Sequence, residues 1–347
     1  MKTLLIIILL TNLFYGCGEN HSKNTSQILP EKVNVDHYKK QRNLFGKVKT
    51  LEVQRYKVVN KFGNISEGEM LENYYIKINN KGERIEYRTF SSDGKLEKKY
   101  LSKYNSQGKK IELIGLDKNN NTISKQEFKY NDTNMVEQNK YNSVGNLEYK
   151  IIYKYDKSGN KIEKSIFRSG NWYKSTYKYN GKGELIYKNE FDVLINKKGY
   201  FERHESFYKY DNKNRKYEEY YYYTKDGMLL ERERKIYDNM GNLIEEKSYW
   251  PNKMLNKRVY KYNSEHNLIL EKTFNPDGST YGLEKYQYDD WGNLLSREIH
   301  VPWNGHEWSN LIEYKYEYDN FNNWVKRTFL NNKIPKEITI RKISYYQ

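Results

Sequence analysis

Hydrophobic and polar positions along this chain show a period of two, carried mainly by tyrosine. Tyrosines two residues apart recur as Tyr153/Tyr155, Tyr177/Tyr179, Tyr208/Tyr210, Tyr260/Tyr262, Tyr286/Tyr288 and Tyr316/Tyr318. Residues two apart point to the same face of a β-strand, so this spacing predicts strands that pack through a stripe of tyrosines. Charged residues such as Glu163, Lys164 and Glu245 crowd the strands after the turns. At least one face of the sheet is therefore expected to be solvated.

A short phrase follows the paired tyrosines: an aromatic residue, Asp or Asn, two variable residues and Gly, as in residues 155–159. Its first position recurs ten times, at intervals of 24 to 31 residues, at Ile78, Tyr104, Tyr130, Tyr155, Tyr179, Tyr210, Tyr237, Tyr262, Tyr288 and Tyr318. Self-similarity at a fixed period is the mark of a repeat architecture. We therefore expect one structural unit of about 26 residues, repeated along the chain.

The chemistry of the phrase predicts a tight turn. Asp or Asn at the first turn position and Gly at the fourth describe a type I turn followed by a left-handed residue, which closes a β-hairpin with a bulge. The predicted turn residues include Asn105, Gly108, Asp156, Gly159, Asn180, Gly183, Asp238, Gly241, Asp289 and Gly292. Where Gly is missing, the fourth position holds Asn134, Asn214, His266 or Asn322. Asn and His tolerate the left-handed region, so we expect the same backbone there.

A second, shorter turn is predicted between successive copies, as in Asn275-Pro276-Asp277-Gly278, with related phrases at residues 91–94 and 224–227. Two strands and two turns of ordinary length account for one period. The expected fold is all-β, with antiparallel β-hairpin repeats that form a long, curled or coiled single-chain sheet over residues 42–347. A flat sheet of that many strands would be unusual, which is why curling is expected.

The beginning of the chain has the layout of a signal peptide. Lys2 precedes the apolar run Leu4–Leu10, and small and polar residues then lead to Gly16-Cys17. An unpaired cysteine after Gly16 resembles the lipobox of bacterial lipoproteins. The resemblance implies cleavage of residues 1–16, lipidation of Cys17 and a membrane anchor. Residues 17–41 are polar without a sustained period and are interpreted as a lipidated flexible tether.

The phrase Tyr-x-Tyr-Asp-x-x-Gly-Asn at residues 153–160 resembles the YD repeat of bacterial RHS-type surface proteins, over roughly residues 74–330. In that family the repeats wind into a coiled β-sheet shell or wall, and the resemblance implies such a scaffold here. RHS toxins also carry a core cleavage motif and a C-terminal toxin domain, and neither is expected before Gln347. The closer likeness is to shorter lipoproteins of Gram-negative bacteria built on such repeats.

Composition agrees with strands and places the chain near the border of disorder. The chain has 347 residues, 37 tyrosines, one cysteine and no alanine, the strongest helix former. AT-rich codons would account for part of this bias. Large amphipathic tyrosine rings supply buried area in place of an aliphatic core. The net charge of +16 favours an anionic polysaccharide or envelope proteins as partners; nucleic acid is not expected for an exported chain.

Catalytic chemistry is not expected. Asp156, Asp211, Asp238, Asp289 and Asp319 share one turn position, and Asn replaces Asp in other copies, which indicates turn support. The six histidines include no common metal spacing, with His300 and His306 the nearest pair. Phosphate loops and nucleophile motifs are missing from the sequence. We expect no enzyme activity, metal or cofactor.

Tryptophan is the one residue type that the repeat does not explain. Five of the six tryptophans fall in the last hundred residues, and an aromatic insertion spans Val301 to Trp308 in a long interval. Loops on a rigid scaffold often carry function. The candidate binding aromatics are Trp291, Trp303, His306, Trp308 and Trp324. The alternative is that they cap an open end of the sheet.

These observations predict a non-catalytic outer-membrane lipoprotein, on either membrane face, whose β-repeat scaffold binds glycan or protein at the cell surface. One alternative is a structural or assembly module of the envelope without ligand specificity. A toxin-related protein is the remaining alternative.

Overall fold

The computed structural model describes residues 44–347 except 194–202, 214, 225–226, 251–252 and 304–305. The signal peptide, Cys17 and the tether predicted before residue 42 therefore lie outside the described residues. Every regular element within the described part is a β-strand. The strands are β1 (Val48–Lys61), β2 (Asn64–Ile78), β3 (Arg84–Phe90), β4 (Leu96–Tyr104), β5 (Lys110–Asp117), β6 (Thr122–Tyr130), β7 (Met135–Asn142), β8 (Leu147–Tyr155), β9 (Lys161–Arg168), β10 (Asn171–Tyr179), β11 (Leu185–Val193), β12 (Arg203–Tyr210), β13 (Lys216–Tyr223), β14 (Leu229–Tyr237), β15 (Leu243–Trp250), β16 (Lys253–Tyr262), β17 (Leu268–Phe274), β18 (Thr280–Tyr288), β19 (Leu294–Trp303), β20 (His306–Tyr318), β21 (Trp324–Asn331) and β22 (Ile334–Tyr345).

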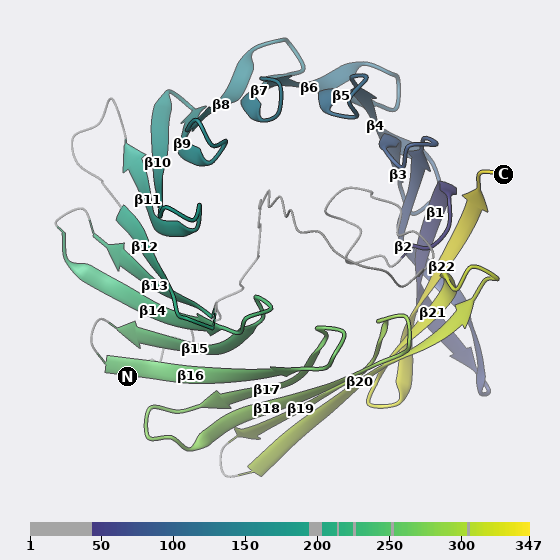
Figure 1. Ribbon diagram of the computed structural model, residues 1–347. Coiled ribbons are helices and arrows are strands. Elements are labelled where there is room, and N and C mark those ends of the chain that lie inside the picture. Colours follow the sequence, from purple (N-terminus) through teal and green to yellow (C-terminus); the bar gives the residue numbers. More distant parts are fainter. Residues whose placement is uncertain (1–43, 194–202, 214, 225–226, 251–252, 304–305) are drawn as a thin grey trace, which may run out of the picture.

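The 22 strands form one antiparallel sheet that closes on itself (Figure 1). Each strand pairs with the next in the chain, and β22 also pairs with β1, with Leu51 opposite Ile343 and Val53 opposite Arg341. The predicted all-β, curled sheet of hairpin repeats is confirmed. Closure through the β1–β22 pairing, called the seam below, is the feature that the repeat did not predict.

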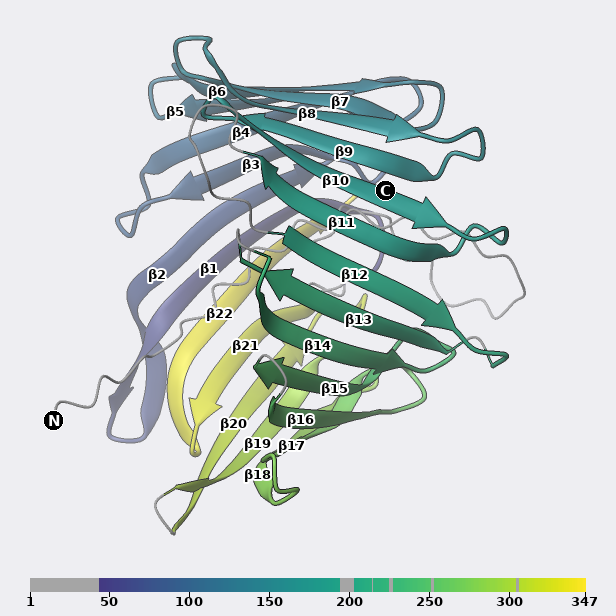
Figure 2. The same cartoon turned by 90° about the vertical axis from the view of Figure 1, so that its left-hand side faces the viewer.

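Because consecutive strands are antiparallel, every second connection lies at the same edge of the ring (Figure 2). The ten copies of the phrase, from residues 79–83 to residues 319–323, connect β2 to β3, β4 to β5 and so on around one edge, here called the repeat rim. Val48 at the start of β1 faces Tyr345 at the end of β22, so both lie at the repeat rim. The remaining connections form the opposite rim.

The turn of residues 156–160 shows why the phrase has its composition. The Asp156 N–H donates to the Asn160 carbonyl at 2.9 Å, and the Gly159 N–H donates to the Asp156 carbonyl at 3.1 Å. Asp156 Oδ1 accepts hydrogen bonds from the backbone N–H groups of Ser158 and Asn160, both at 2.9 Å. Gly159 has φ of 84°, in the left-handed region that costs other residues a steric penalty.

The other predicted turn residues lie in the same backbone arrangement. At each, the first-position N–H bonds the carbonyl four residues later, and the glycine N–H bonds back to the first position. The glycine φ values lie between 76° and 84° at Gly108, Gly183, Gly241 and Gly292. Turns at the opposite rim beginning at Ser91 and Asn275 have this same geometry, so they are no shorter than the phrase turns.

The copies without glycine divide into two kinds. His266 and Asn322 have φ of 63° and 62°, in the left-handed region as expected. The expectation for Asn134 was wrong: it has no positive φ, and the Asn131 N–H bonds the Asn134 carbonyl directly at 3.0 Å. The strand resumes at Met135 opposite Tyr130, so this turn is one residue shorter and needs no left-handed residue. Asn214 lies outside the described residues.

Replacing Gly159 with alanine is expected to lower the free energy of unfolding by about 1 to 2 kcal/mol, because alanine is strained at positive φ. Gly181 is the matched control: it lies in another phrase turn, lacks a positive φ, and has open space where a Cβ would point. Gly181→Ala should leave stability unchanged or raise it slightly. Denaturant unfolding of the two variants measures the difference, and equal losses would contradict the turn geometry.

The best-buried side chains lie at the seam rather than around the whole ring. Val48, Leu51, Val53, Tyr74, Ile76 and Ile78 form the hydrophobic core cluster, and Leu44, Tyr87, Ile343 and Tyr345 pack against it. The first described residues thus fold back onto the strands that close the ring. The hydrophobic effect is concentrated where the two distant ends of the sheet meet.

The two faces of the sheet differ in burial. The paired tyrosines lie on one face, the tyrosine face, and the lysine that precedes the last tyrosine of a strand points to the other. Side-chain exposure of these lysines is 69% for Lys103, 63% for Lys129 and 60% for Lys154. The paired tyrosines are only partly exposed. Side chains converge on the concave side of a closed sheet, so we assign the tyrosine face to the inside of the ring.

Candidate functional site

The tyrosine at the first position of the phrase links neighbouring repeats. Pairing between β7 and β8 stops at Glu137 opposite Ile152, before the strands reach the repeat rim. The unpaired ends of the two strands leave a gap at the repeat rim, here called a wedge. The Tyr155 hydroxyl spans this wedge and donates to the Met135 carbonyl at 2.7 Å. Equivalent bonds run from Tyr104 to Arg84, from Tyr130 to Lys110, from Tyr179 to Lys161, from Tyr210 to Leu185 and from Tyr262 to Leu243. In each case a tyrosine hydroxyl donates to a backbone carbonyl at the start of a neighbouring strand.

A half-exposed aliphatic side chain occupies the same place in several wedges. These residues follow the first strand residue after the turn, and 36% to 38% of each is exposed, at Ile111, Ile162, Ile186 and Ile269. Together with the paired tyrosines they form a band on the tyrosine face beside the repeat rim, here called the tyrosine belt. The sequence analysis recognised the tyrosines but did not identify these aliphatic residues. Their recurrence at the second strand position after the turn could have indicated them.

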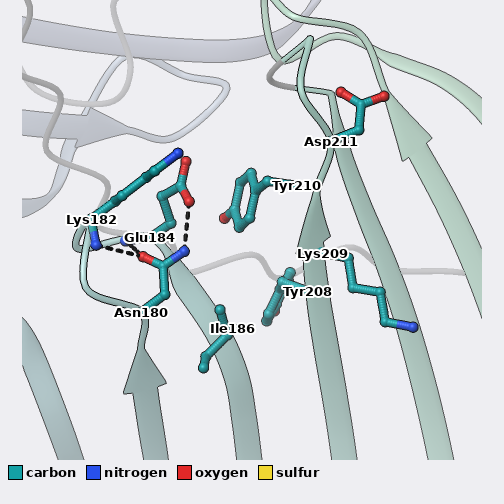
Figure 3. Close-up of a pocket in the computed structure, with 8 residues that line it drawn as sticks. All are labelled: Asn180, Lys182, Glu184, Ile186, Tyr208, Lys209, Tyr210 and Asp211. Atoms are coloured by element: carbon teal, nitrogen blue, oxygen red, sulfur yellow. Dashed lines mark hydrogen bonds between the residues drawn. The ribbon is translucent and has the colours of Figure 1, made fainter.

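One wedge widens into a cavity of about 430 Å³ between β11 and β12 (Figure 3). Figure 3 shows the Tyr208 and Tyr210 rings on the side of Ile186 and the turn, whereas Lys209 extends away from them. The cavity is lined by Asn180, Lys182, Glu184, Ile186, Tyr208, Lys209, Tyr210 and Asp211. Asn180 Nδ2 donates to Glu184 Oε2 at 2.7 Å, which fixes the polar edge of this cavity. Its lining thus combines aromatic and aliphatic surfaces with polar groups.

Cationic side chains lie over several rings of the belt. Lys161 Nζ is 5.7 Å from the Tyr153 ring centroid and 5.1 Å from that of Tyr177. Lys110 Nζ is 5.7 Å from the Tyr104 centroid. Both lysines are the first strand residue after a phrase turn, so they occupy equivalent positions in two repeats. Distances below about 6 Å are favourable for cation–π attraction.

Deeper on the tyrosine face, burial shifts the ionisation of the side chains. It raises the pKa of Tyr177 to about 12 and that of Tyr316 to about 12. Burial and the neighbouring Glu233 also raise the pKa of the Glu231 carboxyl. Burial together with Glu284, which lies opposite in the strand register, raises the pKa of Glu271. Partial burial on the tyrosine face therefore disfavours the charged forms of these side chains.

Ion-pair rows run along the other face. Glu137 lies between Lys129 and Lys150, at 2.9 Å from each nitrogen, and these hydrogen bonds lower its pKa to about 2. Glu163 is bridged in the same way by Lys174 at 2.7 Å and Lys154 at 3.0 Å, and its pKa is also lowered to about 2. Glu137 and Glu163 thus each bridge two lysines across neighbouring strands.

The predicted aromatic residues are separated by the fold. Trp324 is only 6% exposed, and the Arg341 guanidinium lies 3.2 Å from its ring centroid. Trp291 lies in a turn at the repeat rim, with its ring 4.7 Å from that of Tyr318. Trp324 is therefore a packing residue of the closed wall, and it does not join the other candidates in one exposed aromatic surface.

Trp303 and Trp308 belong to a hairpin at the opposite rim. Trp303 pairs with His306 and Val301 with Trp308, so the predicted aromatic insertion lengthens β19 and β20. Trp308 is 50% exposed. Because β22 pairs with β1, the sheet has no lateral end at this place for these tryptophans to cap.

Exposed apolar side chains recur at successive connections along the same rim. The opposite-rim apolar set comprises residues that are at least 41% exposed at or next to these connections: Phe62, Ile65, Val144, Leu147, Met228, Trp250, Leu255, Tyr281, Trp308 and Ile334. They are distributed one or two to a connection, and Trp308 has the largest side chain among those of the long β19–β20 hairpin. Only Trp308 among them was singled out from the sequence, since each of the others is an isolated apolar residue beside a turn.

The described residues contain no group of three or more His, Cys, Asp or Glu side chains that could hold a metal ion. In the same part of the chain, no helix has the length and apolar character needed to cross a membrane. The predicted lipidation site, Cys17, lies outside it.

No protein-family model matches the chain, and its sequence matches no curated protein. Among solved structures, the chain is similar to TcdB2-TccC3-TEV, with a TM-score of 0.31, 9% identity and coverage of 83% of this chain but only 19% of that one. It is also similar to a porin-like protein from Bacteroides uniformis ATCC 8492, with a TM-score of 0.29, 10% identity and coverage of 86% and 96%. A porin-like protein from Bacteroides vulgatus ATCC 8482 is similar with a TM-score of 0.26 and 11% identity. The match covers 71% of this chain and 97% of that one.

Proposed function

We propose that the chain is a non-catalytic lipoprotein of the cell envelope whose ring of β-repeats is a scaffold for binding glycan or protein at the cell surface. The signal-peptide layout and the lipobox resemblance at Cys17 support export and anchoring. The YD-repeat resemblance supports a scaffold role. The residues that recur in every repeat form turns and tyrosine hydrogen bonds. Binding is therefore assigned to side chains that vary between the repeats and lie in their connections.

The observation that carries the proposal is the opposite-rim apolar set. The chain enters the ring at the repeat rim, where Leu44 packs against the core cluster. Aromatic residues on the opposite rim are suited to stack on sugar faces or to fill pockets of a protein partner. The long β19–β20 hairpin with Trp308 is the most prominent aromatic feature there.

The double variant Trp303→Ala with Trp308→Ala is expected to bind surface polysaccharide extracted from the source bacterium about tenfold more weakly, because aromatic anchors dominate binding energy. Binding of the purified mature chain to the immobilised extract measures this. Met240→Ala is the control, since Met240 is 64% exposed but lies at the repeat rim. Unchanged binding by the double variant would rule out the hairpin as the site. A wild-type chain that bound no polysaccharide would overturn the glycan role and favour a protein partner or a purely structural module.

A further inference from the structure

We infer that a row of aromatic side chains on the outer face of the ring binds a linear, uncharged glycan. This row, here called the aromatic row, consists of Tyr187 in β11, Phe207 in β12, Tyr221 in β13 and Tyr249 in β15. The inference rests on the proposed function and adds to it a second binding surface and a class of glycan. The aromatic row is separate from the tryptophan hairpin of the opposite rim.

The strand register places the aromatic row on the outer face. Phe207 precedes Tyr208, which lies on the tyrosine face, so the Phe207 side chain points outward. Tyr187 lies directly opposite Phe207, and directly opposite residues share a face. The register from β12 to β15 puts Tyr221 and Tyr249 on this same face. Figure 2 shows β11 to β15 side by side.

The rings of the aromatic row contact one another across successive strands. The ring centroids of Tyr187 and Phe207 are 5.2 Å apart, and those of Phe207 and Tyr221 are 5.8 Å apart. The Arg232 guanidinium makes the next link, at 5.8 Å from the Tyr221 centroid and 5.0 Å from the Tyr249 centroid. Phe207 is 39% exposed, and the other three rings are partly buried. The row is therefore an aromatic strip that is open to solvent.

The shape of the ring favours a narrow occupant. The sheet closes on itself, so its outer face is convex around the circumference, the direction in which the aromatic row runs (Figure 1). A flat protein surface, or the outer face of a second copy, would touch only part of such a row. A single polymer chain can follow the curvature and contact every ring. Four strand spacings give the row a length of about 19 Å, which a few linked sugar units would cover.

The polar groups beside the rings suit hydroxyl groups. The Tyr187 hydroxyl donates to Glu205 Oε1 at 2.9 Å, and the Tyr221 hydroxyl donates to Glu219 Oε2 at 2.9 Å. A carboxylate accepts several hydrogen bonds, so both can also accept from sugar hydroxyls. The Arg232 guanidinium lies 3.6 Å from Glu219 Oε1 on the same strip. Because charges of both signs flank the rings, a ligand of either sign would meet repulsion and an uncharged ligand would not.

A cavity beside Phe207 has the size and lining for one sugar unit. Its volume is about 320 Å³, and its lining includes the aromatic side chains Phe207 and Tyr217 and the polar side chains Glu219 and Arg234. A pyranose ring has apolar C–H faces and a rim of hydroxyl groups, which match aromatic walls edged by polar groups. We place one sugar unit in this cavity and the following units along the aromatic row.

The inference is tested by calorimetric titration of the mature chain with cello-oligosaccharides, which are linear and uncharged. We expect the Kd to fall about tenfold from cellobiose to cellohexaose, because the longer chain contacts more rings. Phe207→Ala combined with Tyr221→Ala should weaken cellohexaose binding about tenfold, since aromatic anchors dominate binding energy. Oligogalacturonate of the same length, which carries a carboxylate on every sugar, should bind more weakly than cellohexaose.

Tyr141→Ala is the matched control. Tyr141 lies on the outer face of β7 and donates to Glu127 Oε2 at 3.3 Å, as Tyr221 does to Glu219. Among the residues that the structure describes, no aromatic ring packs against Tyr141. Its replacement removes an outer-face tyrosine without touching the aromatic row, so cellohexaose should bind this variant as it binds the wild type.

Each outcome decides for or against the aromatic row. Length-independent binding, tighter binding of oligogalacturonate, or equal losses in the Phe207/Tyr221 and Tyr141 variants would overturn it. Cellohexaose binding that is lost in the Trp303/Trp308 variant but kept in the Phe207/Tyr221 variant would overturn the aromatic row while preserving the proposed function. If cellohexaose did not bind at all, the glycan occupant would be wrong and a protein partner would replace it.

Thermal unfolding separates a loss of binding from a loss of fold. The Phe207/Tyr221 variant should unfold at the wild-type temperature. If it unfolds earlier, Phe207→Leu takes its place, because leucine keeps an apolar side chain at this position but has no flat ring. Cellohexaose binding by Phe207→Leu at the wild-type Kd would then contradict stacking on the aromatic row.

Discussion

Replacing Leu51 with alanine is expected to lower the free energy of unfolding by about 2 to 5 kcal/mol, the largest loss anticipated for any apolar truncation in this ring. Leu51 has no exposed surface, and it pairs with Ile76 of β2 on one side and Ile343 of β22 on the other. Its side chain therefore joins the first and last strands. Truncation would remove buried area and leave a cavity in the core cluster at the seam.

Denaturant unfolding of the variant and the wild type measures this effect. Leu147→Ala is the matched control, because Leu147 is 41% exposed at the start of β8. Its truncation should cost no more than about 0.5 kcal/mol, as for most surface substitutions. Equal losses for the two leucines would show that the seam does not contribute more to stability than the rest of the ring.

Replacing Asn323 with leucine is expected to cost about 2 to 4 kcal/mol, because it leaves buried polar groups without partners. Asn323 has no exposed surface. Its Oδ1 accepts from the Phe45 N–H at 2.6 Å, and its Nδ2 donates to the Phe45 carbonyl at 2.9 Å and to the Tyr345 hydroxyl at 2.7 Å. One amide thus ties the first described segment to the last repeat and to the end of β22.

Asn160 supplies the matched control because it has the same position in its own phrase turn. Its Nδ2 donates to Asp156 Oδ2 at 3.0 Å, a bond within an exposed turn. Asn160→Leu should cost only about 0.5 to 1.5 kcal/mol, the usual net value of a single hydrogen bond. Hydrogen exchange at the β1–β22 amides should accelerate in Asn323→Leu and stay at the wild-type rate in Asn160→Leu. Acceleration in both, or in neither, would contradict the seam role.

The repeat and its turns could be predicted because they depend on local chemistry. The spacing of Asp156 and Gly159 specifies a left-handed residue at the fourth turn position, and the structure has φ of 84° there. The expectation that failed at Asn134 is equally local in cause. A single missing residue shortened the connection, and a period that varies from copy to copy could not reveal it.

The candidate sites could be predicted less well. The tryptophans are close in sequence, but Trp324 lies inside the wall and Trp308 is exposed at the opposite rim. The half-exposed Ile162 and Ile186 of the belt were not predicted, since an aliphatic residue after a turn normally indicates a packed core position. Burial depends on which strands become neighbours and on the direction in which the sheet curves.

The sequence by itself determined the unit of this protein: a hairpin of about 26 residues, its turn type and the face that its tyrosines share. Those properties follow from steric limits on φ and from side-chain alternation, which act between residues close in the chain. Only the tertiary structure decided that the sheet closes, since the seam joins residues such as Thr50 and Ser344 that are 294 positions apart. Closure in turn distinguishes the inner face of the sheet from its outer face, because only a closed sheet encloses one of its two sides.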